Sequence, residues 1–159
     1  MNNYLRIAAA ATALSLSLTL TACSMSAPDL KSSLARSVVA GVPRATGALI
    51  GLNYDGSPER RGVGTKVYID SEAGGDVAVA VDSALKTLWE RFPVEPVSID
   101  VSVVTGPMPV NAKYAASDGE RLRGAAVDLG LDLADGDLRT VIVGQKELEQ
   151  RYGPWKKPE

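Results

Sequence analysis

The chain has 159 residues, with 17 basic and 19 acidic side chains and a formal net charge of −2. Histidine is absent, which excludes a histidine-based catalytic triad and a zinc hydrolase with histidine ligands. The slightly acidic balance gives no reason to expect nucleic acid as a partner, because such binding depends on clustered cations. The single cysteine, Cys23, cannot form a disulfide within the chain.

The first 22 residues have the pattern of an export signal. The amino terminus and Arg6 supply positive charge, and an uncharged apolar stretch follows from Ile7 to Leu20. This stretch has 14 residues, fewer than the roughly 20 that a membrane-spanning helix needs. We therefore expect residues 1–22 to direct export and to be removed.

The next feature is the sequence Leu20-Thr21-Ala22-Cys23, which resembles the lipobox of bacterial lipoproteins. The resemblance implies cleavage between Ala22 and Cys23 and a thioether-linked lipid on Cys23. Each buried methylene of an acyl chain contributes about 0.8 kcal/mol, so such a lipid would hold the domain on a membrane. The implied location is the cell membrane or outer membrane, facing the periplasm or exterior. An ordinary signal peptide and an uncleaved anchor are the alternatives.

Beyond the signal, the chain reads as a tether over 23–28, one domain over 29–153 and a tail over 154–159. Apolar residues at helical spacing predict helices over 29–40, 77–92, 117–129 and 145–152. Alternating or continuous apolar residues predict strands over 45–54, 63–70, 97–105 and 138–143.

The strand over 97–105 has the clearest pattern, with apolar side chains alternating with Ser98, Asp100 and Ser102. Such a polar face is typical of a sheet covered on one side only. We therefore expect an α+β fold, a two-layer sandwich of about four mostly antiparallel strands with helices mainly on one face. Ser117 and Glu120 have the spacing of a capping box at the start of the third helix.

Residues 30–92 give a helix, a turn at Gly41 and Val42, two strands and a second helix. This order is distantly similar to the helix-strand-strand-helix-strand plan of BON domains, which are envelope modules linked to phospholipid surfaces. The resemblance implies a phospholipid-surface role. The insertion at 55–62 departs from the plan.

Each of three motifs can be interpreted either as a chemical site or as an ordinary structural feature. Ser83 and Lys86 have the S-x-x-K spacing of penicillin-binding enzymes, although a solvated helix face explains them as well. The run Gly62–Lys66 resembles a phosphate-binding loop, but the predicted strand after it favours a turn entering a strand. Asp132, Asp135 and Asp137 could bind calcium, although an Asp and Gly turn accounts for the same residues. We expect no metal or other cofactor.

Arg60 and Arg61 in a loop, and Trp155 near the carboxyl end, are the residues we expect to take part in binding. The arginines would be attracted to anionic lipid, and the tryptophan could bind a partner or pack on the body of the domain. The sequence thus favours a non-enzymatic, lipid-anchored envelope domain that binds a protein or another envelope component. A phospholipid-surface module and an unrecognised enzyme are the alternatives.

Replacing Cys23 with serine tests the lipid anchor. Cys23→Ser removes the thiol that forms the thioether, so labelling with radioactive palmitate should be abolished and the product should be unprocessed or released from the membrane. Electrophoresis of labelled, fractionated cells measures both outcomes. Retained labelling would contradict the anchor.

Overall fold

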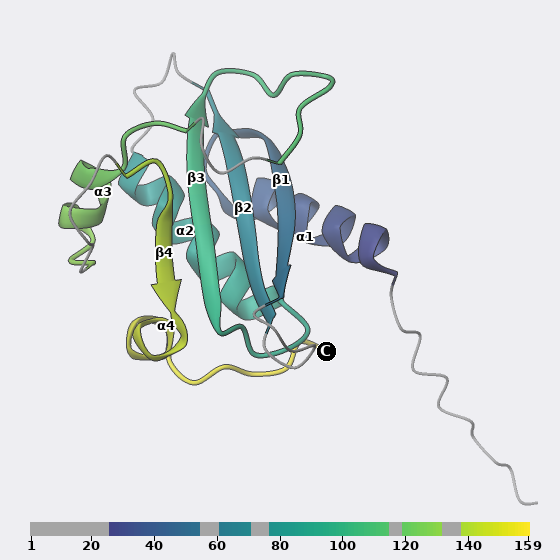
Figure 1. Ribbon diagram of the computed structural model, residues 1–159, viewed down its shortest axis with the longest axis vertical. Coiled ribbons are helices and arrows are strands. Elements are labelled where there is room, and N and C mark those ends of the chain that lie inside the picture. The colour runs from purple at the N-terminus through teal and green to yellow at the C-terminus, as the bar shows by residue number, and fades with distance from the viewer. Residues whose placement is uncertain (1–25, 55–60, 71–76, 115–118, 132–137) are drawn as a thin grey trace, which may run out of the picture.

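A computed structural model of the chain describes residues 26–54, 61–70, 77–114, 119–131 and 138–159 (Figure 1). Its helices are α1 (Ala27–Gly41), α2 (Val77–Arg91), α3 (Arg123–Asp128) and α4 (Gln145–Tyr152). Its strands are β1 (Ala45–Tyr54), β2 (Arg61–Ile69), β3 (Ser98–Thr105) and β4 (Val141–Gly144). The elements follow one another in the predicted order, which confirms the α+β class.

The four described strands form one mixed sheet in the order β1-β2-β3-β4. The pairs β1–β2 and β3–β4 are antiparallel, whereas β2 and β3 are parallel. Two parallel neighbours need a crossover connection, and α2 provides it. The strand order places this parallel pair, β2 and β3, in the middle of the sheet.

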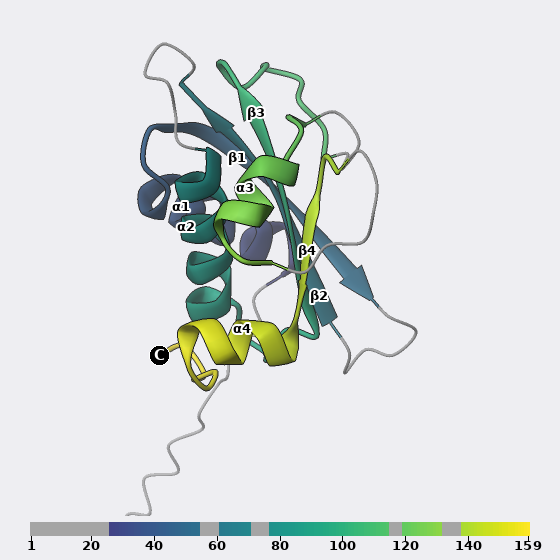
Figure 2. The same cartoon turned by 90° about the vertical axis from the view of Figure 1, so that its left-hand side faces the viewer.

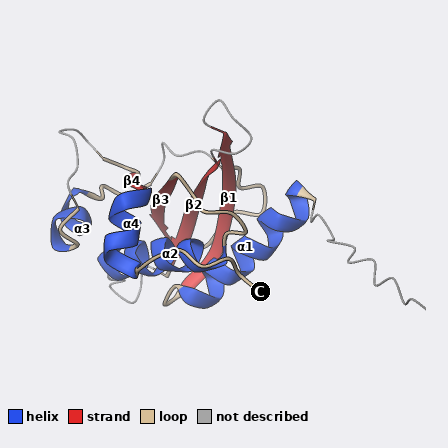
Figure 3. Ribbon diagram, turned by 90° about the horizontal axis from the view of Figure 1, so that it is seen from below, coloured by secondary structure: helices blue, strands red, loops and turns tan. Residues whose placement is uncertain are grey.

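The helices α1 and α2 cover one face of this sheet (Figure 3). The helices α3 and α4 lie beside α2, near β4 (Figure 2). The core between the layers contains fully buried aliphatic side chains from both, among them Val81, Leu85 and Leu88 of α2 and Val67 and Val101 of the sheet. Each such burial stabilises the fold by about 1.5–3 kcal/mol. The apolar stripe predicted for α2 is confirmed.

The start of α1 differs by two residues from the prediction. Ser26 is the N-cap of the helix, and its hydroxyl accepts a hydrogen bond from the backbone N–H of Asp29 at 3.4 Å. Ala27 and Pro28, which the sequence placed in the tether, thus belong to the helix. The signal and Cys23 lie outside the described residues.

The third helix is shorter than predicted, and Glu120 does not cap it. The helix begins at Arg123, and the carboxylate of Glu120 instead accepts a hydrogen bond of 2.7 Å from the Thr105 hydroxyl. The backbone N–H of Glu120 donates to the Val103 carbonyl. Glu120 therefore ties the approach to α3 to the end of β3. Ser117 lies outside the described residues.

The expectation of a sheet covered on one side only is wrong. Lys66 and Tyr68 of β2, and Ser102 of β3, point away from the helices but are 0, 6 and 1 % exposed. The segment after β3 covers this second face, and its first part crosses from β3 towards β1 (Figure 1). Polar alternation here marks a face covered by a loop instead of a face open to water.

Glycines make room for this covering segment. An ideal Cβ built on Gly47 would lie 2.7 Å from the Cβ of Met108, and one on Gly51 would lie 2.7 Å from Cδ1 of Tyr114. A Cβ on Gly64 would lie 2.9 Å from Cζ of the same tyrosine. These separations are too short for real side chains. We call Gly47, Gly51 and Gly64 the glycine track, over which Met108 and Tyr114 of loop 106–114 pack against the sheet.

The glycine track predicts the effect of adding one methyl group. Gly64→Ala should displace the Tyr114 ring and lower the free energy of unfolding by about 1–3 kcal/mol, the usual cost of overpacking. Chemical denaturation measures this change. The loss should shrink in a Tyr114→Ala background, because the two changes act on one contact.

Gly124 provides a matched control, since a Cβ there would meet nothing within 4 Å and the residue lies inside α3. Gly124→Ala should leave stability unchanged or raise it by less than about 1 kcal/mol, because Gly124 lies in the first turn of α3. Equal effects of the two substitutions would contradict the role of the glycine track.

Candidate functional site

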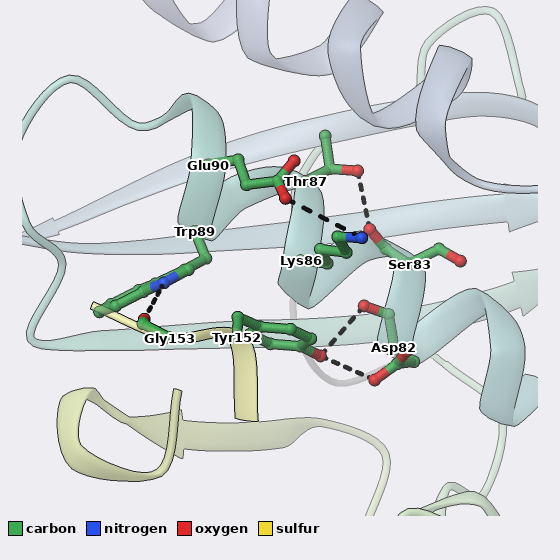
Figure 4. A network of polar contacts seen from close by, with 8 residues as sticks. All are labelled: Asp82, Ser83, Lys86, Thr87, Trp89, Glu90, Tyr152 and Gly153. Carbon is green, nitrogen blue, oxygen red and sulfur yellow. Dashed lines mark hydrogen bonds and ion pairs between the residues drawn. The ribbon is translucent and has the colours of Figure 1, made fainter. Parts of the chain in front are cut away.

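The structure does not assemble the enzyme-like motif on α2. Lys86 Nζ lies 4.0 Å from Glu90 Oε1, and both side chains are exposed. The hydroxyl of Ser83 points away from the Lys86 ammonium group (Figure 4). The Ser83 carbonyl accepts a hydrogen bond of 2.7 Å from the Thr87 hydroxyl. The S-x-x-K spacing of Ser83 and Lys86 therefore belongs to a solvated face of α2.

A polar network beside this motif joins α4 to α2 (Figure 4). Arg151 Nε and the Tyr152 hydroxyl both donate to Asp82 Oδ1, at 2.7 and 2.8 Å. Trp89 Nε1 donates to the Gly153 carbonyl at 3.1 Å. Burial, with the hydrogen bond to Asp82, raises the pKa of Tyr152 far above its ordinary value. The network keeps the tyrosine a neutral donor and fixes the end of α4, which is a structural role.

The residues predicted to take part in binding do not form one common site in the described part of the chain. Trp155 packs against the core, and its indole N–H is buried with no hydrogen-bond partner among the described residues. It thus packs on the body of the domain, one of the two roles expected for it. Arg61 is partly buried at the start of β2, where it lines a cavity. Arg60 lies outside the described residues.

The two remaining motifs are the run Gly62–Lys66 and the group of three aspartates. Gly62–Lys66 lies wholly inside β2 and so forms neither a phosphate-binding loop nor a turn before the strand. Asp132, Asp135 and Asp137 lie outside the described residues. Within the described ranges, no group of three or more acidic or cysteine side chains could hold a metal ion.

The second face of the sheet contains a polar pair that the sequence patterns did not reveal. Asn53 of β1 donates from Nδ2 to Asp100 Oδ2 of β3 at 2.9 Å, across Gly62 and Gly64 of β2. The other carboxylate oxygen, Oδ1, is buried with no partner among the described residues. Burial raises the pKa of Asp100, and the hydrogen bond from Asn53 lowers it by less.

Tyr114 lies over the same part of the sheet. Burial and the negative charge of Asp100 raise the pKa of its phenol. The ring fills the space left by two residues of the glycine track, Gly51 and Gly64. Tyr114 and Asp100 therefore form the fixed base of the segment that covers the second face.

The outer side of this segment exposes apolar side chains, together with the polar Asn111 and Lys113. Val110 is 100 % exposed and Met108 is 38 % exposed, with Pro107 and Pro109 beside them. The start of the segment is held by the Thr46 hydroxyl, which donates to the Gly106 carbonyl at 3.2 Å. Two prolines limit the backbone further. Loop 106–114 thus presents apolar side chains from a rigid base, as binding loops commonly do.

The strand predicted over 97–105 and the helix predicted over 117–129 left a connecting segment here, but the sequence analysis did not predict what supports it. The available signal was the position of the glycines: Gly47 and Gly51 share one face of β1, and Gly64 is the partner of Gly51 in β2. Side chains alternate along a strand, so three glycines on one face indicate a close approach by another segment.

No protein-family model, curated protein or solved structure matches this chain. Among the described residues, none of the helices combines the length and apolar character required to cross a bilayer.

The buried Asp100 carboxyl predicts a pH dependence of stability. Its pKa is raised above the ordinary value of 3.8, so the folded protein binds this proton more tightly than the unfolded chain does. The contribution of Asp100 to stability is therefore fully present below the pKa of the unfolded chain and is lost as pH rises through the raised pKa. The Asp100→Asn variant cannot ionise at this position, so it should not lose stability in this way as pH rises.

Urea denaturation at several pH values between 3.5 and 7 measures the effect. The free energy of unfolding of the Asp100→Asn variant, relative to the parent chain, should increase with pH across this range. Asp128→Asn, at an exposed carboxylate of α3, is the control and should follow the parent chain. A constant difference between Asp100→Asn and the parent would refute the assignment.

Proposed function

We propose that this chain is a non-enzymatic lipoprotein of the bacterial cell envelope that binds an envelope protein through loop 106–114. The observation that carries the binding role is the fully exposed Val110 on a loop held by the glycine track. An exposed apolar side chain on a fixed loop loses little conformational entropy when a partner buries it. The partner is a protein with an apolar depression for Val110 and Met108.

The anchor rests on the lipobox-like sequence Leu20-Thr21-Ala22-Cys23. With a lipid on Cys23, the domain is restricted to one membrane face, either the cell membrane or the outer membrane. This restriction raises the effective concentration for a partner in the same membrane or layer. A small apolar loop can then support a specific association that would be weak between free proteins.

A second candidate is a phospholipid-surface module. The observation that favours it is the helix-strand-strand-helix-strand order over residues 27–105, the plan on which the resemblance to BON domains rests. In that case the membrane itself is the partner. The enzyme alternative gains no support from the separated Ser83 and Lys86 side chains.

A photo-crosslinking residue at position 110 tests the binding role in growing cells. We expect a discrete protein adduct, because the Val110 side chain is fully exposed. The control is the same residue at position 127, where Val127 is also apolar and 72 % exposed but lies on α3. Mass spectrometry of the purified adducts identifies what is joined.

The outcomes separate the candidates. A protein adduct at 110, absent at 127 and weakened by Gly64→Ala, supports binding through the loop. A lipid adduct at 110 favours the phospholipid module. Identical adducts at both positions, or none at 110, would overturn the proposal.

A further inference from the structure

The free edge of β1 is the longest unpaired strand edge in the described part of the chain. β1 ends the sheet on one side and has ten residues, whereas β4 ends it on the other side and has four. From Gly47 to Asn53, the backbone groups form no hydrogen bond with a described residue outside β2. β1 therefore presents a row of N–H and C=O groups on the side away from β2.

This edge lacks the features by which edge strands usually resist the addition of another strand. Its sequence, ATGALIGLNY, has no charged residue and no proline. A shift of register between Ala45 and Gly47 disturbs only its first residues. β4, in contrast, is protected by its shortness. An extended peptide can therefore pair with a much longer stretch of β1 than of β4.

The space beside β1 is bounded on two sides. On one face of the sheet, α1 passes β1 and continues beyond it, and on the other face loop 106–114 projects past β1 in the same direction (Figure 1, Figure 3). A cavity of about 200 Å³ lies between Ala27 and Leu30 of α1 and Leu52 and Asn53 of β1. The first turn of α1 therefore does not close the end of this edge. The arrangement leaves a place for one extended chain.

A second copy of this chain fits this place poorly. Antiparallel pairing of two β1 strands has a two-fold axis through the joined sheet, which puts the helices of both copies on the same side. The part of α1 that projects beyond β1 would then meet the same part of the second α1. A segment that carries no helix of its own avoids this conflict. The structure therefore favours an extended segment of a different protein.

We propose that β1 binds an extended, uncharged segment of a partner protein as a further strand of the sheet. The inference deepens the proposed function and rests on it for the identity of the partner, because Met108 of loop 106–114 packs on Gly47 of this strand. Alternate side chains of an added strand would face the loop. Backbone hydrogen bonds supply the affinity, and the exposed apolar side chains of the loop favour aliphatic residues on that side.

A peptide of alternating valine and threonine, with a lysine at each end for solubility, tests strand addition. The protein is the chain comprising residues 24–159, which contains every described element, and NMR measures amide hydrogen exchange. With saturating peptide, exchange should slow about tenfold at every second residue from Gly47 to Asn53, because the amides between them already bond to β2. The amides of β4 should not change. No protection of β1, or protection of β4 in its place, would overturn the proposal.

A chemically blocked peptide and two protein variants are the controls. The same peptide with a methyl group on every amide nitrogen cannot donate hydrogen bonds, so it should bind about tenfold more weakly. Leu49→Lys places a charge in the middle of β1 and should weaken binding of the unblocked peptide several-fold. Ile142→Lys makes the same kind of change on β4, at a side chain that is 60 % exposed, and should leave binding unchanged. Equal binding of the two peptides would contradict strand addition without any change to the protein.

Analytical ultracentrifugation of the chain alone tests the choice of occupant. We expect a monomer, and a dimer that Leu49→Lys dissociates would assign the edge to a second copy and overturn the proposal. The two proposals also fail separately. Peptide binding at β1 without a protein adduct at position 110 would refute the proposed function alone. An adduct at position 110 without protection of β1 by the peptide would refute strand addition alone.

Discussion

The central strand β2 is buried on both faces, and this constraint shapes the rest of the molecule. From Gly62 to Ile69, all its residues are buried. Its parallel pairing with β3 requires a helix between the two strands, and that helix, α2, covers one face. All-parallel sheets occur almost only with both faces covered, and the parallel pair in this mixed sheet has the same arrangement. The chain therefore needs a second cover, and loop 106–114 provides it over the glycine track.

The sequence predicted what is determined locally. The order of the elements, the bounds of α4 and the buried stripe of α2 follow from residues three or four apart on one helix. Alternation along β3 placed Ile99, Val101 and Val103 in the core, where they are fully buried. These patterns depend on the geometry of single helices and strands, so they do not require knowledge of the fold.

Long-range contacts were not predictable in the same way. The alternation of Asp100 and Ser102 with apolar residues predicted a sheet face exposed to water. A polar face that is covered by a loop has the same sequence pattern. Glu120 bonds Thr105, 15 residues away, in place of capping its own helix. The Asn53–Asp100 hydrogen bond joins strands separated by β2. Only the coincidence of three glycines on one face pointed to the missing cover.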